Sequence, residues 1–356
     1  MRQARGINQV DLQTSQDTPV ADAEQFHDLT SLVNHELRTP LTSIYGVLGL
    51  LNSGYLGSLS EEGQRLLGIA LHNTNRLIRL ADAIAHEPAI SMAILSDVDL
   101  EHLQLENDFH AAFDRQELQL YYQPIVAVET GVIIGFEALA RWFHPVKGWI
   151  SPSVFIPLAE KTDLIHSLGL WSLEEACRQL RLWQQRFPMH PPLTMSVNLS
   201  TLQLLQPDLV RQVRQVLQRH QIAAESLKLE ITESSLIQDY ERANAILTEL
   251  RTMGIQFYID DFGTGYSSLG RLKDLPIHVL KIDRSFVSDK KWDICESILL
   301  LAAKLGLGVV AEGVETRAEM LALKTLGCQQ MQGYFFSRPV DPQTAGSLIL
   351  ASLCAG

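Results

Sequence analysis

The spacing of hydrophobic residues changes near residue 104 and divides the chain into two parts. Between residues 26 and 87, apolar side chains recur every three or four positions, which places them on one face of a helix. A glycine-containing break at residues 52–60 separates two such runs, and Pro40 predicts a kink in the first. The pattern predicts a helical hairpin over residues 26–87.

Two amphipathic helices leave a hydrophobic face uncovered when they pair only with each other. A second copy of the hairpin would cover this face in a four-helix bundle, so we expect a homodimer. Residues 1–25 lack the apolar core of a signal peptide and are expected to form a disordered N-terminus. Residues 88–103 are expected to be a linker.

After residue 104, short apolar runs alternate with longer amphipathic ones. Strands are expected at residues 118–128, 132–142, 194–200, 227–234, 256–262, 278–287, 308–315 and 329–337. Helices are expected between most of them, at residues 170–187, 207–220, 239–253, 293–305 and 316–326. This alternation predicts an α/β fold, a TIM-type (β/α)8 barrel over residues 104–352. The turn between the first two strands is too short for a crossover helix, so we expect a modified barrel with an antiparallel first strand.

Two adjacent acids end the fifth predicted strand. Asp260 and Asp261 directly follow the apolar residues 257–259, and Gly263 and Gly265 let the next loop bend. Carboxylates this close repel and raise each other's pKa unless a cation compensates. Their oxygens are ligands that Mg²⁺ prefers, so the pair suggests a metal site. For the pair alone, an exposed turn with two solvated aspartates is the alternative.

Similar polar side chains occur at the other predicted strands. They are Glu137, Asn198, Glu230, Glu233, Lys281, Asp283, Glu312, Glu315 and Gln332. The carboxyl ends of barrel strands converge on one face, so residues scattered along the chain would form a single cluster. Surface loops would not explain this recurrence, and the pattern predicts a catalytic face that holds metal.

Composition narrows the range of partners. The 356 residues carry a formal net charge of −12, which argues against general binding to nucleic acid or to an anionic membrane. The four cysteines form no CxxC pair, so neither a zinc site nor a disulfide framework is indicated. Apolar runs are too short to span a membrane. We expect a cytoplasmic protein that neither inserts into membranes nor binds nucleic acid.

Eight motifs follow one another in the second part of the chain. They lie at residues 121–125 (YYQPI), 135–142 (GFEALARW), 196–200 (SVNLS), 229–234 (LEITES), 259–269 (IDDFGTGYSSL), 280–287 (LKIDRSFV), 309–316 (VVAEGVET) and 332–339 (QGYFFSRP). Together they resemble the EAL family of cyclic di-GMP phosphodiesterases, whose signature is Glu137-Ala138-Leu139 in this chain. The resemblance implies hydrolysis of cyclic di-GMP to linear pGpG, which lowers the level of this messenger in bacterial signalling. It also implies two Mg²⁺ or Mn²⁺ ions per active site.

The resemblance implies a role for each residue of the cluster. The implied metal ligands are Glu137, Asn198, Glu230, Asp260 and Asp261. The implied catalytic residues are Lys281, Glu312 and Gln332, together with Asp261. Arg141 and Asp283 would contact the substrate, where a guanidinium suits two phosphate oxygens at once. Glu233 and Glu315 would support the following loop and the metal-binding face.

A separate motif, NHELRTPL at residues 34–41, lies in the first helix of the predicted hairpin. It resembles the phospho-acceptor box of sensor histidine kinases, and the resemblance extends over residues 26–87. It implies that His35 would accept a phosphoryl group beside Glu36 as its acid–base neighbour. We find no ATP-binding motif of a kinase. Two interpretations stay open: a bundle that only dimerises, and one that a separate sensor histidine kinase phosphorylates.

Function also leaves alternatives. An active phosphodiesterase is expected, because every implied metal ligand is present. There are two alternatives. The chain could be an inactive EAL domain that only binds cyclic di-GMP, or a scaffold that docks to a histidine kinase. Residues 288–297 form a segment shorter than in relatives by about one helical turn. This shortening would weaken a contact between barrels and leave the hairpin as the main dimerising element.

Overall fold

The computed structural model describes residues 40–49, 51, 67, 70, 74, 97–232, 239–264 and 272–355. The chain divides into two compact units, Met1–Leu105 and Glu106–Gly356. In the first unit residues 40–49 are helical. His35 and most of the predicted hairpin lie outside the described residues, as do residues 1–25.

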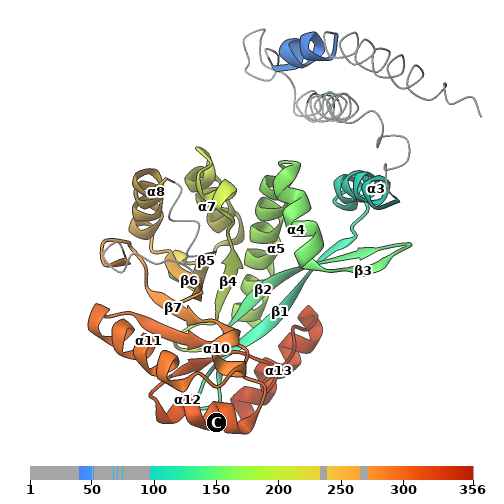
Figure 1. The fold of residues 1–356 in the computed structure, drawn as a ribbon. Coiled ribbons are helices and arrows are strands. Elements are labelled where there is room, and N and C mark those ends of the chain that lie inside the picture. The colour runs from blue at the N-terminus through green and yellow to red at the C-terminus, as the bar shows by residue number, and fades with distance from the viewer. Residues whose placement is uncertain are drawn as a thin grey trace, which may run out of the picture. The chain divides into compact units, whose positions relative to one another are not determined.

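The second unit is built on a closed barrel of strands (Figure 1). Its strands are β1 (Leu118–Ala127), β2 (Ile133–His144), β4 (Thr194–Asn198), β5 (Leu227–Thr232), β6 (Gln256–Phe262), β7 (Val279–Ile282), β8 (Gly308–Ala311) and β9 (Gln330–Met331). Neighbours follow the order β1-β9-β8-β7-β6-β5-β4-β2, and the β1–β2 pairing closes the ring. β1 is antiparallel to both of its neighbours, and the other pairings in the ring are parallel. The predicted barrel with an antiparallel first strand is therefore confirmed. A short strand, β3 (Gly148–Ile150), extends β2 as a hairpin.

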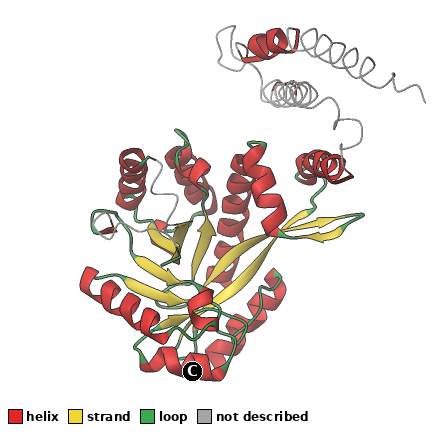
Figure 2. Ribbon diagram, viewed as in Figure 1, coloured by secondary structure: helices red, strands yellow, loops and turns green. Residues whose placement is uncertain are grey.

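Helices cover the outside of this barrel (Figure 2). They are α4 (Pro152–Lys161), α5 (Ile165–Arg186), α6 (Thr201–Leu204), α7 (Leu209–His220), α8 (Tyr240–Thr252), α10 (Arg284–Ser288), α11 (Trp292–Leu305), α12 (Arg317–Thr325) and α13 (Pro342–Ala355), with a 3-10 turn at Ala224–Ser226. A further helix, α3 (Asp97–Ala112), begins within the segment expected to be a linker.

Burial on two sides explains the composition of the strands. The outer helices cover one face of each strand and the barrel interior covers the other, so parallel strands of this kind are nearly continuously hydrophobic. In β5 every residue except Thr232 is buried. Between the barrel and α5, the Trp183 ring packs 4.9 Å from Tyr122 and 4.8 Å from Phe136, centroid to centroid. These ring contacts hold β1 and β2 against α5.

Several predicted strands are shorter in the structure: the predicted strand 308–315 ends as β8 at Ala311, and two others lose more residues. The predicted strand 278–287 ends as β7 at Ile282, because Asp283 caps α10 and accepts a hydrogen bond from Ser285 N at 3.0 Å. The apolar residues that follow pack as the first turns of a helix. The predicted strand 329–337 pairs only at Gln330–Met331. In both segments the residues typical of strands therefore continue beyond those that pair with a neighbouring strand.

Candidate active site

A single lysine occupies the centre of the barrel near the carboxyl ends of the strands. The side chain of Lys281, on β7, is fully buried. Its Nζ lies near carboxylate oxygens of residues in, or directly after, four different strands: 2.5 Å from Glu230, 2.6 Å from Glu312, 3.1 Å from Asp260 and 3.7 Å from Glu137. Residues separated by up to 175 positions (312 − 137) thus meet around one ammonium group.

Glu137 is held in place by two amides. Asn198 Nδ2 donates to one carboxylate oxygen of Glu137 at 2.8 Å, and Gln332 Nε2 donates to the other at 2.6 Å. Gln332 Nε2 also lies 3.0 Å from Gln123 Oε1. Gln123 lies directly across the β1–β2 ladder from Glu137. These contacts fix the orientation of the carboxylate before any ligand arrives.

The charges in this cluster shift one another's pKa. Burial alone would lower the pKa of Lys281, but the surrounding carboxylates outweigh it and raise that pKa well above its usual value. Burial would raise the pKa of Glu137, but Lys281 and the amides of Gln332 and Asn198 outweigh burial, so the pKa is lowered. Burial dominates for Glu230, whose pKa rises to about 8 although Lys281 opposes the change. Burial also raises the pKa of Glu312 well above its usual range. One cation therefore does not compensate all of these carboxylates.

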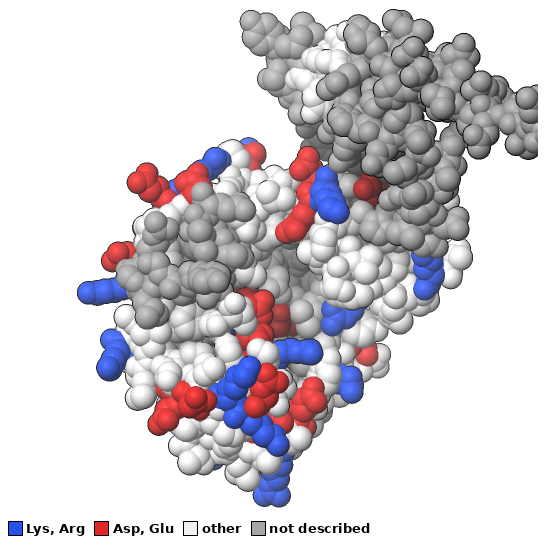
Figure 3. Space-filling model, viewed as in Figure 1, with Lys and Arg blue, Asp and Glu red and all other residues white. Residues whose placement is uncertain are grey.

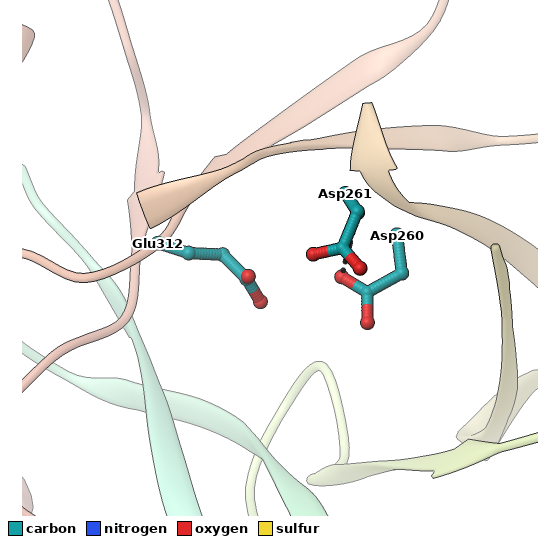
Figure 4. Close-up of side chains that lie close together, drawn as sticks. All are labelled: Asp260, Asp261 and Glu312. Carbon is teal, nitrogen blue, oxygen red and sulfur yellow. Dashed lines mark hydrogen bonds between the residues drawn. The ribbon is translucent and has the colours of Figure 1, made fainter. Parts of the chain in front are cut away.

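A second group of acids lies beside the lysine. Ligand oxygens of Asp260, Asp261 and Glu312 all lie within 4.8 Å of one another, and Figure 4 shows the three carboxylates turned toward a shared space. Asp261 has a left-handed backbone, with φ of 53°, where the β6–β7 register shifts. Its N–H donates to Asp260 Oδ1 at 3.1 Å. Burial raises the pKa of Asp261 to about 6, with Asp260 and Asp283 adding to the effect.

The donor atoms of this cluster fit a divalent metal ion. Carboxylate and amide oxygens are the ligands that hard cations such as Mg²⁺ and Mn²⁺ take. Within the described parts of the chain, the buried oxygens Glu230 Oε1 and Gln332 Oε1 have no hydrogen-bond partner. Acidic side chains gather in a hollow of this face in Figure 3. Excess negative charge and unsatisfied oxygens are both what a bound cation would relieve.

The other predicted residues are placed differently. Arg141 lines a cavity of about 540 Å³ that also reaches Asn198 and Glu230. Its guanidinium lies 5.9 Å from the centroid of the Tyr121 ring. Glu315 is exposed, and the contact recorded for it is a hydrogen bond from its backbone N–H to Glu319. Glu233 lies outside the described residues.

Gln123 was missed by the search of strand ends. Because β1 runs antiparallel to its neighbours, its residue that faces the cluster lies within the strand and not at the carboxyl end. The motif YYQPI at residues 121–125 contained the available signal, since a glutamine buried in a strand needs a hydrogen-bond partner.

Among the described helices, none is both long and apolar enough to cross a membrane.

A family model described as "EAL domain" matches residues 106–339, and one described as "His Kinase A (phospho-acceptor) domain" matches residues 27–85.

Two similar proteins come from Pseudomonas aeruginosa. The bifunctional diguanylate cyclase/cyclic di-GMP phosphodiesterase MucR is 47% identical over 68% of this chain and 36% of its own length. The cyclic di-GMP phosphodiesterase NbdA is 38% identical over 80% of this chain and 36% of its own length. The chain therefore spans about a third of the length of these relatives.

Two solved structures are also similar. A structure titled as the MucR phosphodiesterase in complex with c-di-GMP is 45% identical, with a TM-score of 0.65, over 68% of this chain and 99% of that one. An EAL enzyme solved with cAMP and cyclic di-GMP bound is 33% identical, with a TM-score of 0.68, over 82% of this chain and 77% of that one.

Proposed function

We propose that this chain, which belongs to the EAL domain family, hydrolyses one phosphodiester bond of cyclic di-GMP and releases linear pGpG. The observation that carries the proposal is the buried Lys281 surrounded by four carboxylates at one end of the barrel. The names of the similar phosphodiesterases support the substrate. Such an activity would lower the level of cyclic di-GMP in bacterial signalling.

We assign metal ligands among the residues whose carboxylate and amide oxygens lie close together around Lys281. Glu137, Asn198, Glu230 and Asp260 would hold a first Mg²⁺ or Mn²⁺ ion. Asp261 and Glu312 would complete a second site, with Asp260 shared between the two. When bound, such ions lower the pKa of water and neutralise phosphate charge.

The chain's own residues would orient the substrate and manage charge. Lys281 has a raised pKa and keeps its proton, so it would stabilise negative charge on the reacting phosphate. Gln332 would hold Glu137 in a ligating orientation. Arg141, at the wall of the cavity, would bind phosphate oxygens with its two-pronged guanidinium. Asp283, which lies beside Asp261, would contact the substrate.

The first unit would dimerise the enzyme. Its similarity to histidine kinase phospho-acceptor domains supports a four-helix bundle formed by two copies. Phosphorylation of His35 by a sensor histidine kinase would use the same segment.

Glu233 and Glu315 would support the loop and the metal face, and the protein would act in the cytoplasm. A receptor without activity and a scaffold for a kinase remain the alternatives.

Product formation tests the proposal directly. The full chain is incubated with cyclic di-GMP and Mg²⁺, and linear pGpG is followed by chromatography. Glu137→Ala and Lys281→Ala should still fold but form little product, because each removes a group of the central cluster. Binding of cyclic di-GMP without product at any concentration of Mg²⁺ or Mn²⁺ would identify a receptor instead. Intact binding of a kinase but not of cyclic di-GMP would identify a scaffold.

A further inference from the structure

A second cavity opens at the opposite end of the barrel from Lys281. It has a volume of about 640 Å³ and is lined by residues at the amino ends of β2, β4, β5 and β9 and by the loop before β9. Volumes of this size suit small ligands. The residues of the candidate active site described above do not line it.

One wall of this cavity carries a buried lysine. Lys228 is only 5% exposed. Its Nζ lies 4.9 Å from the centroid of the Tyr258 ring. In the part of the chain that the structure describes, no carboxylate forms an ion pair with Lys228 and no group accepts a hydrogen bond from it. An ammonium group offers three donors, and an aromatic face replaces only a small part of what water would supply. A cation held in this way calls for an acceptor from outside the chain.

A second polar group on the same wall is also unpartnered. The side-chain oxygen of Gln330, on β9, is buried and has no hydrogen-bond partner within the described residues. Two other polar side chains that line the cavity are already paired. Thr194 Oγ1 donates to the Ile134 carbonyl at 3.1 Å, and Lys324 at the rim pairs with the exposed Glu129 at 3.1 Å. Away from the exposed rim, the site therefore offers one strong cationic donor and one acceptor.

We propose that this cavity binds a small oxyanion that also carries a hydrogen-bond donor. A negatively charged oxygen would accept from Lys228, and an O–H group of the same molecule would donate to Gln330 Oε1. Hydrogen phosphate and hydroxycarboxylates both have this chemistry. Lys228 lies two residues before Glu230 on the same strand, with both side chains inside the barrel, so the occupant would lie on the amino-end side of the metal-binding face.

Thermal unfolding with added anions tests the proposal. The metal-free full chain is titrated with inorganic phosphate, and in parallel with malate, while chloride keeps the ionic strength constant. A rise in Tm of about 3 to 6 °C is expected when the anion is tenfold above its dissociation constant, and above that constant Tm should keep rising with the logarithm of the anion concentration. The anion that raises Tm at the lower concentration identifies the source. No rise beyond that of the chloride control with either anion would mean that water alone fills the cavity, and would overturn the proposal.

Matched variants locate the effect. Lys228→Met keeps the length of the side chain and removes the charge, so the anion-dependent rise in Tm should disappear while the protein still folds. Lys324→Met removes the rim lysine that already has a partner and should keep the rise. The reverse pattern, or the same rise in Lys228→Met as in the wild type, would overturn the proposal.

Crystals soaked in arsenate, which like phosphate keeps an O–H group at neutral pH, give a readout that does not depend on stability. An anomalous peak within hydrogen-bond distance of Lys228 Nζ is expected. Arsenate found at surface lysines but not at Lys228 would contradict the site.

Discussion

The barrel interior contains two buried lysines, and they have opposite surroundings. Lys281 lies among four carboxylates near the carboxyl ends of the strands, and these acids raise its pKa well above the usual value. Lys228 lies near the amino ends, where burial lowers its pKa to about 8 and Glu230 offsets this only in part. Two layers of side chains can be distinguished inside the barrel, one near the carboxyl ends of the strands and one near the amino ends. A buried lysine pairs with carboxylates in the first layer and has no such partner among the described residues in the second.

The two layers come from the same strands, two residues apart. Below Lys281, Asp260 and Glu312 lie Val279, Tyr258 and Val310, which pack with Ile125 in a small apolar cluster. Side chains two positions apart on a strand point to the same side, so a short pattern of alternation specifies both layers. The apolar layer gives the charged layer a dry base, which strengthens the interactions of its charges. Single substitutions in each layer therefore test whether the two layers have separate roles.

The largest effect is expected for Lys281→Met. Without its ammonium, four converging carboxylates lose their shared partner. Product formation should fall by about 10³-fold. The free energy of unfolding of the metal-free protein should fall by about 3 to 5 kcal/mol. Chromatography of pGpG and chemical denaturation measure the two quantities.

The matched control is Lys228→Met in the other layer. It removes a buried charge that has no carboxylate partner, so turnover should change little and stability should be equal or higher. Equal losses of turnover in the two variants would show that the layers do not have separate roles.

Removal of divalent metal should affect activity much more than folding. A chelator should abolish turnover by the wild-type protein, because the proposed chemistry needs the ions. Its far-ultraviolet circular dichroism should stay unchanged, since Lys281 still compensates part of the negative charge. Restoring Mg²⁺ should restore turnover. Unfolding on chelation would mean that the ions, and not the lysine, hold the charged layer together.

Gln332→Leu tests the amides that position Glu137. Its Nε2 donates to Glu137 at 2.6 Å, and removal of such a supporting donor commonly weakens metal affinity by about 10 to 100-fold. The Mg²⁺ concentration for half-maximal activity should therefore rise by about 10 to 100-fold in Gln332→Leu. The control is Gln330→Leu, at the start of β9, which should leave this Mg²⁺ concentration unchanged. A similar rise in both variants would point to a general distortion of β9.

The sequence predicted the barrel and the residues that converge on Lys281, because strand alternation and the parallel geometry of a barrel decide both. It did not identify Gln123, whose strand runs in the opposite direction and brings it to the site from mid-strand. Glu315 lies four residues after β8, which ends at Ala311, and is exposed; its support of the metal face stays a prediction. Which strand residue is the last to face inward depends on bulges and helix caps, and these are set by tertiary contacts.

The isolated lysine of the lower layer was also not predicted. Lys228 and Glu230 are both buried in β5, and the sequence alone gave no reason to expect the lysine to lack a carboxylate partner. Its environment depends on Tyr258 and on the cavity beside it, which bring together strands that are distant in the chain.

The smallest change in activity is expected for Val310→Ala, which tests whether the apolar layer acts only as support. Val310 is fully buried and lies two residues before Glu312 on β8. Loss of two methyl groups from a packed site should lower the free energy of unfolding by roughly 1 to 3 kcal/mol. Turnover at saturating Mg²⁺ should stay within about twofold, because the variant removes no group that contacts substrate or metal. A large loss of turnover with unchanged stability would mean that the lower layer sets the geometry of Glu312 directly, and the two layers would then have to be treated as one site.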